Sequence, residues 1–108
     1  MTRNEFAWNS NASVIYLDFP LGTGFSQAPT MMSYRVLDSQ FQEDFVAFME
    51  GFMHNLPKFK GRQIFLAGEG LSGHLIPVIA HYLVADKNPN INLAGIAIGN
   101  GWICWKEF

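Results

Sequence analysis

Hydrophobic residues in this 108-residue chain gather into runs of two kinds. Short apolar runs at 14–17, 63–67 and 93–98 are typical of buried strands. Between them, residues 38–55 carry apolar side chains three and four positions apart, as an amphipathic helix does. A second helix is expected at about 72–85, and 20–35 and 86–90 are expected to be loop and turn. The order β-α-β-α-β predicts an α/β fold with a three-stranded parallel sheet.

The expected helix at 38–55 has an almost continuous stripe of large side chains. We interpret this stripe as core packing, and a groove for a lipid or a cofactor is the alternative. Ser39 to Gln42 has the pattern of a capping box, and Pro57 is expected to end the helix. The stripe consists of Leu37, Phe41, Phe45, Phe48, Met49, Phe52, Met53 and Leu56.

Residues 64–77 combine the end of a strand, a tight glycine turn and the start of a helix. α/β-Hydrolases present their nucleophilic serine on such a turn, at the centre of Gly-x-Ser-x-Gly or a close variant. Here the central residue is Gly70, with Gly68 and Ser72 as its small neighbours. Glycine tolerates the positive φ that this position requires, so the turn is expected to form without the hydroxyl.

Three blocks of sequence resemble the serine carboxypeptidase family. The turn block resembles that family's Gly-Glu-Ser-Tyr-Ala-Gly-His-Tyr-Ile-Pro, and it runs Gly68-Glu69-Gly70-Leu71-Ser72-Gly73-His74-Leu75-Ile76-Pro77. Upstream, a block resembling Leu-Asp-Gln-Pro-Val-Gly-Thr-Gly-Phe-Ser follows a Trp-Asn pair, and it runs from Leu17 to Ser26. Downstream, residues 93–101 resemble Leu-Lys-Gly-Ile-Ala-Ile-Gly-Asn-Gly. The blocks occur in the family's order across nearly the whole chain.

The resemblance implies a partial α/β-hydrolase, with residues 1–108 as a single central fragment of the domain. It implies release of C-terminal amino acids from peptides through an acyl-enzyme, with Gly70 at the nucleophile position. The amide of Leu71 matches the oxyanion donor, and Glu69 matches the glutamate that binds the substrate's C-terminus. The family's catalytic aspartate and histidine, and its second oxyanion loop, match no part of this sequence. We therefore expect a truncated, inactive form; the alternatives are a non-catalytic peptide-binding relative and a remnant without a stable product.

Three other chemistries fit the residues less well. A displaced nucleophile at Ser72 is disfavoured, because a hydroxyl at a helix start more naturally caps a backbone amide. Residues 68–73 also spell the dinucleotide fingerprint Gly-x-Gly-x-x-Gly, but the acid expected at the end of the next strand is missing and Asp86 lies at a helix end. The histidines lack the spacing and third ligand of a metal site, and they are His54, His74 and His81. We expect neither a metal nor a cofactor.

Composition adds limits on partners and location. A net charge of −2 gives no reason to expect nucleic acid or an anionic membrane as a partner. The single cysteine, Cys104, excludes an internal disulfide. The first residues lack the apolar stretch of a signal peptide, whereas the resemblance implies a secretory, lysosomal or vacuolar protein. Asn11-Ala12-Ser13 is an N-glycosylation sequon just before an expected buried strand. The outer strands of an isolated fragment would be exposed edges that favour self-association.

Overall fold

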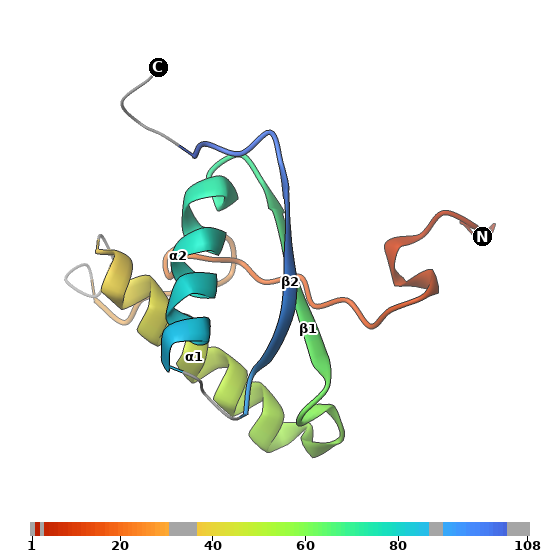
Figure 1. Ribbon diagram of the computed structural model, residues 1–108, viewed down its shortest axis with the longest axis horizontal. Helices are drawn as coiled ribbons and strands as arrows, with labels where there is room; N and C mark the ends of the chain where they lie inside the picture. The colour runs from red at the N-terminus through yellow and green to blue at the C-terminus, as the bar shows by residue number, and fades with distance from the viewer. Residues whose placement is uncertain (1, 3, 31–36, 87–89, 104–108) are drawn as a thin grey trace. The chain divides into compact units, whose positions relative to one another are not determined.

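The computed structural model describes residue 2 and residues 4–30, 37–86 and 90–103. The chain divides into two compact units, residues 1–34 and 35–108. The second unit holds two α-helices, a parallel pair of strands and a short 3-10 turn (Figure 1). The expectation for Cys104 falls outside the described residues, as does most of the expected turn at 86–90.

The first unit is mostly irregular. A 3-10 turn, η1, spans Trp8–Ser10. A loop follows in which the Phe25 amide donates to Asp18 Oδ2 over 2.8 Å and the Ser26 hydroxyl donates to the Asp18 carbonyl over 2.6 Å. Residues 14–17 form no strand, contrary to the expectation from their apolar run. A β-branched run favours a strand only when a neighbouring strand completes its backbone hydrogen bonds, and the described part of this unit contains none.

The second unit has a two-stranded parallel sheet of β1 (Gln63–Glu69) and β2 (Asn92–Gly99). The expected α/β class and parallel pairing are thus confirmed, and the described residues contain two strands in place of the expected three. The helices are α1 (Asp38–Asn55) and α2 (Ser72–Asp86), close to their expected ranges. The 3-10 turn η3 (Pro57–Phe59) links α1 to the region before β1, and Pro57 ends the helix as expected.

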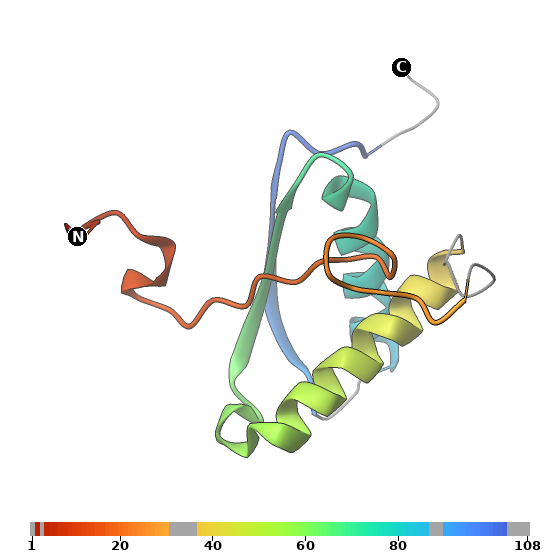
Figure 2. The ribbon, with the colours of Figure 1, turned by 180° about the vertical axis from the view of Figure 1, so that it is seen from behind.

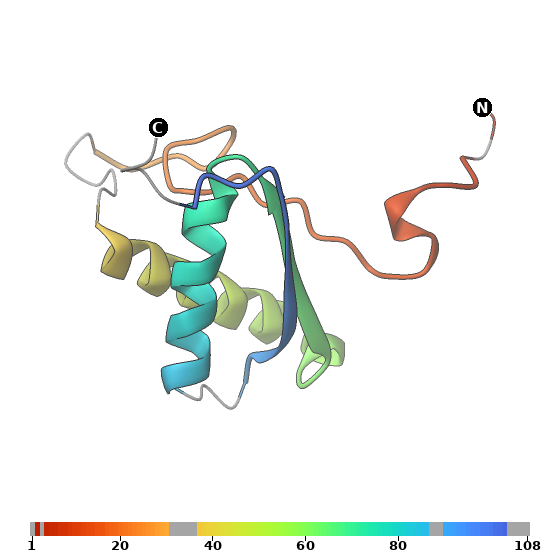
Figure 3. The same ribbon diagram turned by 45° about the horizontal axis from the view of Figure 1, so that its top comes forward.

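Both helices lie on the same side of the sheet (Figures 2 and 3). Helix α2 packs against both strands, and α1 packs against α2. Pro77 lies inside α2 without interrupting it. The opposite face of the sheet has no covering element within the described part of this unit, and Phe65 on that face keeps 66% of its surface exposed.

The core lies between α1 and α2. Four residues of the stripe are buried in it, which confirms for these four the interpretation as core packing. From α1 it takes Phe41, Phe45, Met49 and Met53, and from α2 it takes Leu75, Ile76, Ile79 and Leu83; Ile91, just before β2, is also buried. Phe52 packs beside the core on Phe59, with ring centroids 5.4 Å apart. Leu37 and Leu56, at the two ends of the stripe, are exposed.

The start of α1 differs from the expected capping box. Leu37 is the N-cap residue, and its amide donates to Oε1 of Gln40 over 3.1 Å. Gln42 instead donates from Nε2 to the carbonyl of Val78 on α2 over 3.3 Å. The capping residue therefore lies two positions earlier than Ser39, and Gln42 bridges the two helices.

Candidate functional site

The turn between β1 and α2 centres on Gly70, whose φ of 60° lies in the left-handed region. Its amide donates to the Gly99 carbonyl over 3.3 Å, and its carbonyl accepts from the Gly73 amide over 2.9 Å. A Cβ added at Gly70 would have no neighbouring atom within 4 Å. The turn is thus held by backbone hydrogen bonds, and the space beside its central residue is open.

Close contacts on either side of Gly70 leave no room for larger residues. A Cβ at Gly68 would lie 2.5 Å from the Ser72 side chain, and one at Gly73 would lie 2.5 Å from Gly101 Cα. The Trp102 amide donates to the Gly70 carbonyl over 2.8 Å, which ties the segment after β2 to the turn. The glycines therefore allow the strand ends and the start of α2 to meet without intervening side chains.

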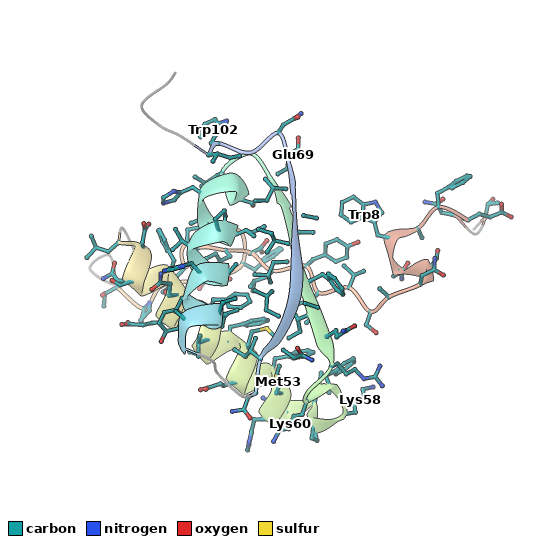
Figure 4. All side chains as sticks on the ribbon, viewed as in Figure 1. Trp8, Met53, Lys58, Lys60, Glu69 and Trp102 are labelled. Atoms are coloured by element: carbon teal, nitrogen blue, oxygen red, sulfur yellow. The ribbon has the colours of Figure 1, made fainter. Side chains whose placement is uncertain are left out.

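Both strands of the parallel pair end at this place. Figure 4 shows Glu69 and Trp102 together at one end of the sheet, with Lys58 at the other end. Asn100 follows β2 with a φ of 46°, an uncommon value for a residue with a side chain. The carboxyl ends of parallel strands are where α/β proteins place their ligands, so this edge is the candidate functional site.

The three residues singled out from the sequence, Glu69, Gly70 and Leu71, are adjacent here. Glu69 is the last residue of β1 and is exposed. Within the described ranges, the Glu69 carboxylate has no hydrogen-bond or ion-pair partner, and the Leu71 amide has no acceptor. Both groups are thus available to a molecule placed over the turn.

Ser72, His74 and His81 differ in the contacts that their side chains make. The Ser72 hydroxyl makes no hydrogen bond to any described residue, so the expected cap on a backbone amide is not formed. His74 Nε2 lies 2.9 Å from Asp38 Oδ1, which joins the first turn of α2 to the first turn of α1. His81 is exposed on α2, and the described residues contain no group of three metal-ligating side chains.

Sequence reasoning missed two contacts of this site. One is the approach of Gly101 and Trp102 to the turn, and the other is the partnership of Asp38 with His74. Each joins residues far apart in the chain, and no local spacing predicts it.

Comparison with known proteins decides the family. The family model for serine carboxypeptidase matches residues 1–107. The chain belongs to the serine carboxypeptidase family. Carboxypeptidase Y of Komagataella phaffii is 41% identical over 98 residues, which cover 91% of this chain and 18% of that protein. Carboxypeptidase Y homolog A of Aspergillus oryzae is 42% identical over 98 residues, with the same coverage. Serine carboxypeptidase-like 36 of Arabidopsis thaliana is 37% identical over 99 residues, covering 91% of this chain and 20% of the relative.

These matches confirm the resemblance drawn from the three sequence blocks. The chain spans about a fifth of the length of the curated relatives it matches. Within the described ranges, neither α1 nor α2 is long and apolar enough to cross a membrane.

Proposed function

We propose that this serine carboxypeptidase-family chain is the part of an α/β-hydrolase domain that carries the nucleophile elbow, in a form without catalytic turnover. The observation that carries the proposal is the turn at Gly70, with its left-handed φ, its open side and its place between β1 and α2. A nucleophile elbow has this strand-turn-helix order and a strained central residue. Gly70 supplies no hydroxyl, so no acyl-enzyme can form at this position.

Two neighbouring groups support peptide recognition at the same turn. The Leu71 amide, which has no acceptor among the described residues, is suited to donate to an oxyanion that forms over Gly70. The exposed Glu69 carboxyl group is suited to bind a substrate's C-terminal carboxylate when the two share a proton. The ligand class is thus a peptide with a free C-terminus, and the implied ancestral reaction is release of its last residue.

The proposal also states what would cover the exposed parts of this fold in the whole domain. In the whole domain, residues 14–17 would form the third strand, and further segments would cover the exposed face around Phe65. Synthesis through the secretory route belongs to the same proposal, since it is what the family resemblance implies. Without those neighbours, two unpaired sheet edges favour self-association of the 108-residue chain.

The decisive experiment uses the full-length protein that contains this chain, with Gly70 retained, changed to serine (Gly70→Ser) or changed to alanine (Gly70→Ala). We expect no acyl-enzyme from the Gly70 and alanine forms. The serine form should raise kcat/KM for C-terminal amino-acid release by roughly 10⁴-fold or more, the scale of a restored nucleophile. The alanine form is the matched control, because it adds Cβ without the hydroxyl. Hydrolysis by the Gly70 form that equals that of the serine form would contradict the proposal.

The non-catalytic alternative is supported by the accessibility of Glu69 and the Leu71 amide. It expects the Gly70 form to bind peptides that end in a free carboxylate, more tightly than the matching C-terminal amides. Glu69→Gln should reduce this preference in titration calorimetry. Dinucleotide binding gains no comparable support, because β2 ends at Gly99 and is followed by Asn100, and neither residue carries a carboxylate.

A further inference from the structure

The segment that follows β2 is hydrogen-bonded to both sides of the turn's central residue. The Gly70 amide donates to the Gly99 carbonyl over 3.3 Å, and the Gly70 carbonyl accepts from the Trp102 amide over 2.8 Å. Between these two partners the chain passes through Asn100, which has a φ of 46°. Trp102 lies at the carboxyl end of the sheet (Figure 4), so a part of the chain outside the turn holds Gly70 in place.

The Gly70 carbonyl and the Leu71 amide belong to one peptide group. A trans peptide is planar, and its C=O and N–H bonds point in opposite directions. A carbonyl oxygen has two lone pairs, and this one accepts from Gly73 over 2.9 Å as well as from Trp102. The Gly73 donor lies in the first turn of α2, whereas the Trp102 donor comes from beyond β2. The two bonds together fix the plane of the peptide group, and with it the direction of the Leu71 N–H.

Two glycines that face each other allow the Trp102 amide to reach the turn. A Cβ added at Gly73 would lie 2.5 Å from Gly101 Cα and 2.6 Å from the Trp102 nitrogen. A Cβ added at Gly101 would lie 2.8 Å from Gly73 Cα and would overlap the Ile98 side chain. Neither position has room for a side chain unless the backbone moves. The close approach of the two glycines therefore sets the length of the bond from Trp102 to Gly70.

The direction of the Leu71 N–H matters because this amide has no acceptor among the described residues. The proposed function gives it the task of donating to an oxyanion over Gly70, where an added Cβ would meet no atom within 4 Å. A donor stabilises such an oxygen only when it is already directed at the oxygen's position. A displacement of about 1 Å can cost about 100-fold in rate.

We propose that the backbone amide of Trp102 is a positioning group, which holds the Gly70–Leu71 peptide and thereby directs the Leu71 N–H at the tetrahedral oxyanion of a bound peptide. The inference rests on the proposed function, because it concerns the same donor. Trp102 acts through the Gly70 carbonyl rather than on the substrate, and its side chain takes no part.

The test removes one hydrogen-bond donor from the full-length protein that contains this chain. Translation with the α-hydroxy acid analogue of tryptophan at position 102 replaces the Trp102 N–H by an ester oxygen and keeps the side chain. The same replacement at Ile103 is the matched control, because the Ile103 amide donates to no described residue.

Isotope labels report on the Leu71 amide without any turnover. Glycine labelled with ¹³C at its carbonyl and leucine labelled with ¹⁵N select Gly70-Leu71, the only Gly-Leu pair in the 108-residue sequence. Loss of the signal in Leu71→Met identifies it in the full-length protein. We expect the ester at position 102 to shift this resonance and the ester at position 103 to leave it in place.

Binding and kinetics measure the consequence for the oxyanion. In the Gly70 form, the ester at position 102 should weaken binding of a peptide phosphinate, a tetrahedral anion that needs no serine, by about 10-fold. It should change binding of the matching peptide by less than about twofold, because a planar carbonyl needs this donor less. In the Gly70→Ser form it should lower kcat by about 10-fold and leave KM unchanged, as expected for an interaction made only in the transition state. The ester at position 103 should have none of these effects.

Three results would overturn the proposal. The first is a Leu71 resonance that stays in place, or that moves equally in both esters. The second is an equal loss of affinity for phosphinate and peptide, which would indicate general damage to the site. The third is a phosphinate that binds with undiminished affinity to the ester at position 102; this inference would then fail alone. If the phosphinate binds to no form and Gly70→Ser shows no turnover, the proposed function fails, and this inference fails with it.

Discussion

Alanine substitutions at three glycines test whether the close contacts and the positive φ around the turn destabilise the protein, beyond the gain in helix propensity that alanine ordinarily brings. Gly51 lies in α1 with open space at its Cβ position, Gly73 lies in α2 against the backbone of Gly101, and Gly70 lies in the turn. In a helix interior, replacing glycine by alanine stabilises by about 0.5–1 kcal/mol. Gly51→Ala should show this gain, and Gly73→Ala should show a loss because of its contact.

The size of the loss at Gly73 follows from the distances. The added Cβ would lie 2.5 Å from Gly101 Cα and 2.6 Å from the Trp102 nitrogen. Ordinary contacts are about 3.5–4.0 Å, so these backbone segments must separate by about 1 Å. Overpacking of this kind costs about 1–3 kcal/mol. The 2.8 Å hydrogen bond from Trp102 to Gly70 would also be lost, at about 1 kcal/mol. After the helix-propensity gain of about 0.5–1 kcal/mol, the net loss is about 1–3.5 kcal/mol.

Gly70→Ala should fall between these two variants. It meets no atom within 4 Å, but its φ of 60° costs a residue with Cβ about 1–2 kcal/mol. Urea unfolding followed by circular dichroism, with unchanged m-values, measures all three. Gly73→Ala should also lower Tm by at least about 4 °C. If Gly73→Ala proves as stable as Gly51→Ala, the close contact with Gly101 does not exist in solution and the description of the site is wrong.

Three further predictions concern other contacts. Asp38→Asn and His74→Ala should show a coupling of at most about 1 kcal/mol in a double-mutant cycle, because both side chains are partly exposed; a coupling that does not fall in 1 M salt would contradict an ionic contact. Met53→Ala removes a side chain that is 2% exposed and should cost about 2–5 kcal/mol, whereas Val84→Ala at an exposed site should stay within about 0.5 kcal/mol. If Met53→Ala and Val84→Ala lost equal stability, Met53 would not belong to the core. Phe65→Lys should reduce self-association in sedimentation velocity without loss of stability, and unchanged association would exclude the uncovered sheet face as its cause.

The sequence correctly predicted the features that depend on the spacing of residues close together in the chain. The stripe of phenylalanines and methionines indicated the bounds of α1, and the glycines at 68, 70 and 73 placed the turn between β1 and α2. The strand at 14–17 was wrong for this chain, because strand formation depends on a partner as well as on propensity. The bounds of α1 were predicted correctly, but its capping box was misplaced, because Gln40, rather than Gln42, accepts from the N-cap amide. The pairing of Asp38 with His74 depends on how α1 packs on α2, which no pattern within either helix specifies.

The turn's shape and its chemistry depend on different residues. A Cβ added at Gly68, Gly73 or Gly101 would lie 2.5 Å or less from a neighbouring atom, so changing any of them moves backbone or adjacent side chains. Gly70 has no such contact, and only its φ opposes a side chain. A serine there would add strain of about 1–2 kcal/mol and gain a hydroxyl directed into open space. Under the proposed function, exchange of serine for glycine at this position would remove the nucleophile and relax the backbone at once, and the close packing around the turn, which depends on the other glycines, would be kept.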